Sequence, residues 1–152
     1  MTNGTIASLH IHPAVAGDPM LATDAFSVVA ENGIENNGEG RLFDRGSKRQ
    51  VTLIEREQLA EHANALGHPG FKPGDVRSNI ETEGINLIAL KGKQVQVGDA
   101  VLLLYEARTP CWKMDELIEG LRERMEKDRH GMLAQVVRSG TIRIGDSIHP
   151  VD

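Results

Sequence analysis

Hydrophobic and polar residues alternate in short runs along most of the chain. In TIASLHIH and in KQVQVG the apolar residues recur with a period of two, which is typical of a strand with one buried face. Other runs, such as AVLLLYEA, are aliphatic over the length of a strand, and Gly or Gly-Asp pairs separate them. Strands are therefore predicted at 5–12, 49–54, 93–98, 100–107, 132–138 and 141–151.

Two segments change to the spacing of a helix. In segment 54–67, Leu59, Ala63 and Leu66 share one face, and the following glycine can end the helix. In segment 113–130, five apolar residues recur at helical spacing, namely Met114, Leu117, Ile118, Leu121 and Met125. Many short strands with two or three short helices are typical of a closed or partly closed β-barrel, so the predicted fold class is mainly β.

Segment 16–47 has the least regular pattern and is rich in glycine and asparagine. We interpret it as a long functional loop rather than a linker, because the chain on either side is too short to form separate domains. One domain over residues 1–152 is therefore expected. The sequence leaves open whether the glycine-rich part at 31–47 closes over a site.

The composition is that of an ordinary globular protein. Because only 3% of the residues are aromatic, the core must consist mainly of Val, Leu, Ile and Ala. The net charge of −5 argues against a nonspecific nucleic-acid partner, which needs a basic surface. The sequence has no apolar run near the roughly 20 residues of a membrane helix, and no leader pattern. A single cysteine cannot form an internal disulfide, so we expect a cytoplasmic protein without a membrane partner.

One stretch departs from this acidic balance. The sequence RLFDRGSKRQ contains four basic residues and one acidic residue. The basic residues are Arg41, Arg45, Lys48 and Arg49. A solvated loop explains most charge runs of this kind. The alternative is a local binding site for a small anionic cofactor or substrate.

Cys111 is the only cysteine of the chain, and it lies between Pro110 and the predicted helix at 113–130. A thiol at a helix N-terminus is favoured as the thiolate, and Arg108 and Lys113 add positive charge nearby, although two acidic residues in the first turn oppose them. A thiolate can bind soft metals, attack electrophiles or carry sulfur. The alternative is that Cys111 is a small buried hydrophobic residue.

A second polar group lies in the sequence GDVRSNIETEG. If this segment is a strand, Arg77 and Asn79 point to one face and Ser78 points away. Arginine offers a planar fork of donors to a phosphate or another oxyanion, and asparagine offers both a donor and an acceptor. An exposed edge pair or a turn cap would explain the same residues. His10 and His12 also share a strand face, but a third metal ligand is not found at a suitable spacing.

The order of these motifs resembles the molybdenum-cofactor sulfurase C-terminal (MOSC) domain. The resemblance rests on RQVTLIEREQL, GDVRSNIETEGINLIALKGKQVQVGDAVLLL, RTPCWKM and HGMLAQVVRSGTIRIGDSI, and it covers about residues 50–148. It implies a β-barrel and a small stand-alone member of the family. The invariant cysteine of the family matches Cys111, and its Arg-x-Asn motif falls on Arg77 and Asn79.

The resemblance further implies that the cofactor is the molybdenum cofactor, molybdopterin, with Cys111 as the metal ligand and catalytic cysteine. A pterin phosphate needs cations and the metal needs a soft donor. Thr109 occupies a position where a hydroxyl can contact the phosphate or the metal centre. The expected cofactor-binding residues are Arg41, Arg45, Lys48, Arg49, Arg77, Asn79 and Thr109.

Three functions follow as hypotheses. The first is an oxidoreductase that reduces N-hydroxylated or similar substrates and receives electrons from a separate redox partner, because the chain has no iron–sulfur or flavin motif. The second is a sulfur carrier with a persulfide on Cys111, as in the sulfurase branch of the family. The sequence has no recognisable pyridoxal-phosphate lysine, so the sulfur would come from a donor protein. The third is a non-catalytic module that binds an anion.

Overall fold

The computed structural model describes residues 3–15, 17–35 and 49–151. The strands are β1 (Gly4–Ile11), β2 (Leu21–Thr23), β3 (Ala25–Val29), β4 (Gly33–Ile34), β5 (Val51–Glu55), β6 (Ile80–Glu83), β7 (Gln94–Val97), β8 (Ala100–Ala107), β9 (Met132–Arg138), β10 (Gly140–Arg143) and β11 (Ser147–Pro150). The helices are α1 (Arg56–Ala65) and α2 (Leu121–Met125), with short 3₁₀ turns η1 (Ile88–Leu90) and η2 (Trp112–Glu116).

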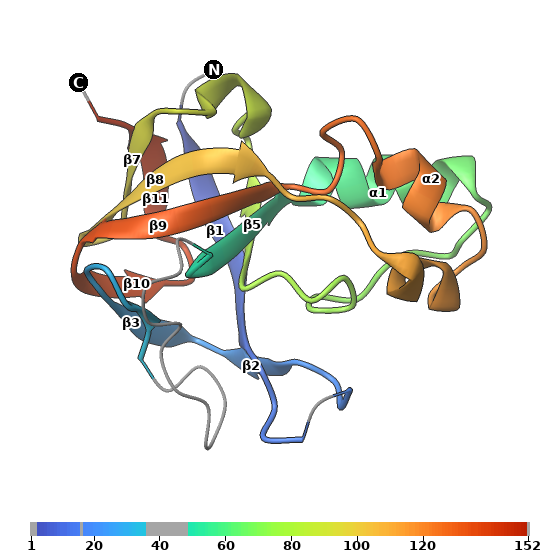
Figure 1. The fold of residues 1–152 in the computed structure, drawn as a ribbon, viewed down its shortest axis with the longest axis horizontal. Helices are drawn as coiled ribbons and strands as arrows, with labels where there is room; N and C mark the ends of the chain where they lie inside the picture. Colours follow the sequence, from blue (N-terminus) through green and yellow to red (C-terminus); the bar gives the residue numbers. More distant parts are fainter. Residues whose placement is uncertain (1–2, 16, 36–48, 152) are drawn as a thin grey trace.

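Seven of these strands form a closed β-barrel, as the sequence predicts. The hydrogen-bonded order is β11-β7-β8-β9-β5-β6-β1, and β11 pairs with β1 to close the ring. β5 and β6 pair in parallel, and the chain between them includes α1. Figure 1 shows α1 and α2 together at one end of the barrel, away from the two chain termini. The connections at this end carry the candidate site.

β5 explains how the barrel and the helices share one strand. Successive side chains of a strand point to opposite faces. Leu53 therefore belongs to the barrel core, whereas Ile54 belongs to a second apolar cluster under the helices. Both residues are fully buried. A strand that is covered on both faces has no need of polar alternation, which is why its sequence reads as the continuous run VTLI.

The prediction of one helix over 113–130 is wrong. The segment begins with η2 and continues as α2, and Gly120 between them has a left-handed backbone with φ of +96°. A right-handed helix cannot pass through this conformation. Met114 and Leu121 still reach the second cluster from the two separate pieces. The apolar spacing therefore identified the buried side chains correctly but not the continuous helix.

The prediction of a long irregular loop over 16–47 is also wrong for the part that is described. β2 extends the barrel sheet beyond β1, and β3 lies between β10 and β4 in a separate three-stranded sheet. In β3 the buried residues Phe26 and Val28 alternate with half-buried ones, so a strand pattern is present. These strands are only two to five residues long, and the surrounding glycines and asparagines obscured them.

The other predicted elements are present. All six predicted strands are found, and the last is divided at the Gly145-Asp146 turn into β10 and β11. The predicted first helix is α1, with Leu59 and Ala63 buried. Within the described part of the chain, the helices are all too short or too polar to cross a membrane.

Candidate functional site

Cys111 is exposed to solvent, so the thiol is accessible and the alternative of a buried hydrophobic residue does not apply. Its backbone is extended, with φ of −116° and ψ of 175°, and its carbonyl accepts a hydrogen bond from the Met114 amide (3.1 Å) at the start of η2. Because η2 is a short 3₁₀ turn rather than a long α-helix, the helix dipole that the sequence suggested is not available to the thiol.

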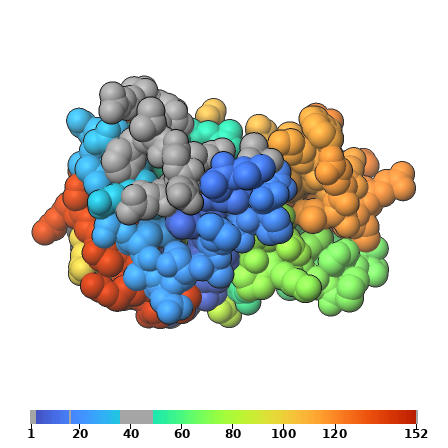
Figure 2. Space-filling model, turned by 90° about the horizontal axis from the view of Figure 1, so that it is seen from below, coloured from blue at the N-terminus to red at the C-terminus, as the bar shows by residue number. Residues whose placement is uncertain are grey.

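Arg77 lies in a turn that precedes β6 rather than in a strand. Its amide donates to the Gly74 carbonyl (3.0 Å), and its backbone is left-handed with φ of 64°. The expectation that Arg77 and Asn79 share a strand face is therefore wrong, since the strand begins only at Ile80. The half-buried Arg77 side chain donates from Nη1 to the Asp18 carbonyl (2.8 Å). Figure 2 shows the face where the N-terminal segment (blue) borders the segments around residues 70–80 (green) and 110–120 (orange).

Asn79 is buried and fixes this turn to the barrel. Its Oδ1 accepts hydrogen bonds from the Thr52 amide and the Thr52 hydroxyl, both at 3.1 Å. Its Nδ2 donates to the His10 carbonyl (3.1 Å). Within the described structure, the side chain thus connects β5 and β1 beneath the turn that carries Arg77. A contact of Asn79 with a cofactor stays a prediction.

Arg108 is a site residue whose importance the sequence did not reveal. It follows β8, and its amide donates to the Gly131 carbonyl (2.9 Å). Its Nη1 donates to the hydroxyl of the fully buried Ser78 (3.1 Å) and to the Val76 carbonyl (3.4 Å). The guanidinium group therefore lies against the same turn that carries Arg77. The only signal in the sequence was its position three residues before Cys111.

The electrostatics of Arg108 connect these residues. Burial, together with the positive charges of Arg49 and Arg77, lowers its pKa to about 10, whereas negative charge on the Cys111 sulfur acts in the opposite direction. Among the described residues, the charged groups that act on Arg108 are thus two other arginines and the thiol. The Ser78 contact places Arg108 against the turn of Arg77, and the charge interactions of Arg108 assign Arg49 and Cys111 to the same electropositive region.

His130 lies beside this region and is neutral at pH 7. Burial, with smaller contributions from the charges of Arg108, His62 and Arg49, lowers its pKa to about 3. Its Nδ1 is buried and has no hydrogen-bond partner within the described structure. His62 is also buried, which lowers its pKa, and its Nδ1 accepts from Arg124 Nε (3.2 Å). The lowered pKa values favour the neutral form of both imidazoles, so they add no positive charge next to the arginines.

The family of the protein follows from a comparison with family models. The model of the MOSC domain matches residues 40–149, which is most of the chain. The chain belongs to the MOSC family. No curated protein matches it in sequence.

Solved structures confirm the MOSC-type barrel. The YuaD protein from Bacillus subtilis has a TM-score of 0.79 and 21% identity, and the alignment covers 99% of this chain and 97% of that one. YiiM from Escherichia coli has a TM-score of 0.74 and 18% identity, with coverage of 100% and 71%. YiiM from Geobacillus stearothermophilus has a TM-score of 0.74 and 16% identity, with coverage of 98% and 75%. At these identities the likeness establishes the fold alone.

The remaining predicted cofactor-binding residues of this MOSC protein are Arg41, Arg45, Lys48 and Thr109. Arg41, Arg45 and Lys48 lie outside the described residues. Thr109 is exposed and lines a hollow of about 560 Å³ together with Arg108 and Pro110, but Cys111 and Arg77 are not part of its lining. The other charged groups of this hollow balance each other, namely Lys91, Arg122 and Lys127 against Glu106, Glu126 and Asp128.

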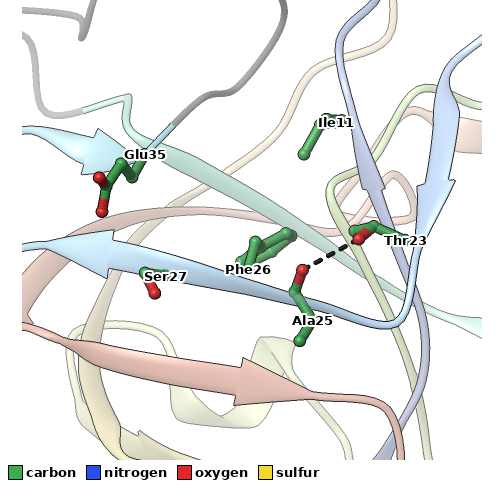
Figure 3. A pocket seen from close by; sticks show the side chains of 6 residues that line it. All are labelled: Ile11, Thr23, Ala25, Phe26, Ser27 and Glu35. Atoms are coloured by element: carbon green, nitrogen blue, oxygen red, sulfur yellow. Dashed lines mark hydrogen bonds between the residues drawn. The ribbon is translucent and has the colours of Figure 1, made fainter.

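A second hollow of about 370 Å³ lies where β1 ends near the small sheet (Figure 3). Its lining includes Ile11, Phe26 and the exposed Glu35, and the Thr23 hydroxyl donates to the Ala25 carbonyl (3.0 Å) at its edge. Among the described residues, its lining includes none of the predicted site residues. The MOSC site considered below therefore consists of Cys111 with Arg49, Arg77 and Arg108.

Proposed function

We propose that this MOSC protein binds the molybdenum cofactor at Cys111 and acts as an oxidoreductase on N-hydroxylated or similar substrates. The observation that carries the proposal is an exposed thiol next to Arg77 and Arg108, in a family associated with this cofactor. The donor set fits the group. A thiolate is a soft ligand suited to molybdenum, and guanidinium groups are suited to the pterin phosphate.

The proposal assigns separate roles to the residues of the site. Cys111 would be the protein ligand of the metal, and Arg49, Arg77 and Arg108 would bind the phosphate or an anionic substrate. Within residues 3–15, 17–35 and 49–151, no three His, Cys, Asp or Glu side chains are grouped to hold a metal ion. The remaining donors to molybdenum would therefore belong to the cofactor. When bound, the cofactor supplies the two-electron chemistry, and the protein orients it.

The reaction would need an external source of electrons. Iron–sulfur clusters are held by several cysteine thiolates, and this chain has one cysteine. We therefore propose a separate redox partner protein. Its docking site is expected on the exposed face around Cys111, because electron transfer needs a short path to the cofactor.

The proposal is tested by metal and pterin analysis of protein purified from a host that makes the cofactor. We expect molybdenum and pterin near one equivalent each in the wild type and a strong loss of both in Cys111→Ser. Arg143→Gln is the matched control, because Arg143 is exposed and pairs with Asp99 (3.4 Å) far from the site in sequence. Wild-type protein that contains neither molybdenum nor pterin would contradict the proposal.

A second candidate function is sulfur delivery, and the exposure of Cys111 favours it. Because the thiol is exposed, it is accessible to the active site of a sulfur-donor protein. The nearby arginines would stabilise the anionic persulfide. After incubation with a cysteine desulfurase and cysteine, mass spectrometry should show one added sulfur atom on Cys111. An unmodified thiol, under conditions that load a known acceptor, would exclude this function. If Cys111→Ser binds anions as well as the wild type does, the result would instead favour a non-catalytic anion-binding module.

A further inference from the structure

The Arg108 side chain is fixed by neutral partners. Its Nη1 donates to the Ser78 hydroxyl (3.1 Å) and to the Val76 carbonyl (3.4 Å), and its own amide is bound to the Gly131 carbonyl. Two hydrogen bonds on one guanidinium nitrogen hold the planar group in one orientation. Little conformational freedom then remains to be lost when a ligand binds.

In this orientation the Nε and Nη2 donors of Arg108 are not needed for the contacts with Ser78 and Val76. A guanidinium group has five N–H donors, and its Nε and Nη2 donors form the fork that binds two oxygens of one oxyanion. Among the described residues, the hydrogen bonds of the Arg108 side chain use Nη1 only. The Nε–Nη2 edge is therefore not used by the described part of the protein.

Among the described residues, Arg108 also has no carboxylate partner. Three described arginines have carboxylate partners, namely Arg56 with Glu81 (3.1 Å), Arg124 with Glu61 (3.8 Å) and Arg143 with Asp99 (3.4 Å). Within the described structure, Arg77 and Arg108 are hydrogen-bonded to carbonyl or hydroxyl groups instead. Arg77 and Arg108 are thus two neighbouring cations without a carboxylate partner among the described residues, although the protein as a whole has a net charge of −5. Such a pair forms a site that an anion completes.

We propose that Arg108 is the oxyanion-binding side chain of the Cys111 site and that Ser78 is the residue that positions it. The ligand class is a phosphate- or sulfate-sized oxyanion, held in front of the thiol by the free edge of Arg108 together with Arg77. This deepens the proposed function, because it rests on Cys111 as the functional centre. The oxyanion could belong to the cofactor or to the substrate, and the experiments below distinguish the two.

The single cysteine makes the site measurable by alkylation. Iodoacetate is an anion and iodoacetamide is its neutral counterpart, so the ratio of their rate constants on Cys111 reports the local positive charge. In cofactor-free full-length protein, Arg108→Gln should lower this ratio about three- to tenfold, as expected for one unit charge a few ångströms away at low salt. Inorganic sulfate should protect the wild type against iodoacetate at concentrations that do not protect Arg108→Gln.

Two further variants distinguish the effect of the positive charge of Arg108 from the effect of its planar pair of donors and from the effect of a surface cation elsewhere. Arg108→Lys keeps the charge but not the planar fork, so it should retain part of the rate ratio while losing most of the sulfate protection. Arg143→Gln removes one surface cation elsewhere and should leave both quantities unchanged. An unchanged rate ratio and unchanged sulfate protection in Arg108→Gln would overturn the proposal.

The positioning role of Ser78 is tested by a double-mutant cycle. Ser78→Ala should weaken sulfate protection severalfold in the wild type but have no further effect in Arg108→Gln, because it acts through Arg108. A purely structural role of Ser78 would give the same effect in both backgrounds and would overturn this assignment.

Cofactor loading identifies the source of the oxyanion. If the oxyanion is the cofactor phosphate, Arg108→Gln purified from a cofactor-making host should contain much less molybdenum and pterin than the wild type. If the oxyanion belongs to the substrate, the molybdenum and pterin contents of the variant should equal those of the wild type. The alkylation experiment uses cofactor-free protein, so absence of molybdenum from the wild type would remove the proposed function and leave the oxyanion site standing. A failed alkylation test would remove the oxyanion site alone.

Discussion

At the scale of single residues, Arg77 combines backbone strain with a functional side chain. Its φ of 64° is a left-handed conformation that disfavours residues with a Cβ atom by about 1–2 kcal/mol. Glycine adopts this conformation at little cost. Strain of this kind persists where the surrounding structure or a function requires the side chain.

We therefore predict that Arg77→Gly is more stable than Arg77→Ala by about 1 kcal/mol, because both lose the guanidinium group but only alanine keeps the strain. The difference is measured from urea unfolding midpoints. Both variants should lose sulfate protection of Cys111 to the same extent. Equal stability of the two variants would show that the turn relaxes without strain.

Asn79 is predicted to matter for stability. Asn79→Ala removes the hydrogen bonds with Thr52 and His10 and leaves buried backbone groups unsatisfied, so the free energy of unfolding should fall by about 2–4 kcal/mol. Asn32→Ala is the matched control, since Asn32 is only half-buried and its side chain, within the described structure, donates only to the nearby Ala30 carbonyl. A loss below 1 kcal/mol in Asn79→Ala would argue against its clamping role.

Residue types alone identified part of the candidate site. Cys111 and Arg77 were chosen from the sequence because a lone thiol and a guanidinium group have distinctive chemistry. Arg108 was counted only as a nearby charge, because its contact with Ser78 joins positions 30 residues apart. Spacing along the chain cannot show which of several arginines turns toward a distant loop.

At the scale of elements, Gly120 decides the shape of the segment after Cys111. It has φ of +96°, and a Cβ atom at this position would lie 3.2 Å from Leu66 Cδ2. Without this glycine the apolar spacing from Met114 to Met125 would suit one continuous helix. The break separates η2 from α2 and keeps the region after Cys111 as a short turn.

We predict that Gly120→Ala lowers the free energy of unfolding by about 1–2 kcal/mol, because alanine disfavours the left-handed backbone and approaches Leu66. Gly92→Ala is the control for backbone strain alone, since Gly92 has φ of +82° and open space around its Cβ position. Both are measured by urea unfolding. A stabilised Gly120→Ala would mean that the segment prefers a continuous helix.

Sequence patterns predicted long elements better than short ones. Apart from β3 and β6, the strands of four or more residues were recognised from alternating or aliphatic runs, because burial of one or both faces leaves such a pattern. β2 and β4 have three and two residues, which is too few to establish any period. They form because β1 and β3 already offer unpaired edges, and this information is not local in sequence.

At the scale of the whole molecule, the buried histidines link stability to pH. The pKa of His130 is about 3 in the folded state and ordinarily about 6.5, so the unfolded chain binds the proton more readily. Its contribution to stability is complete above pH 6.5 and is lost as the pH falls toward 3. His62, whose pKa is also lowered by burial, acts in the same direction.

We predict that wild-type stability falls between pH 6.5 and 5 by up to about 1.4 kcal/mol per pH unit for each of these histidines. His130→Gln removes one of them, so its free energy of unfolding should depend less on pH over the same interval. Urea unfolding at several pH values measures both slopes. Parallel slopes for the two proteins would show that His130 does not titrate on unfolding.

The barrel itself was predictable because several independent signals agree on it. Strand-length runs, Gly-Asp turns and the order of family motifs all indicate the same architecture, and the MOSC match confirms it. The register between strands could not be predicted, because it depends on contacts between residues far apart in the chain.

The pairing of β1 with β11 has a consequence for biosynthesis. Gly4 lies opposite Ile148, so the seam of the barrel joins two strands that are far apart in the chain. A chain truncated before Ser147 would leave one edge of β1 and one edge of β7 unpaired, and such open edges promote aggregation. Ring closure therefore requires β11, so the barrel depends on contacts between residues far apart in the chain, and such contacts slow folding.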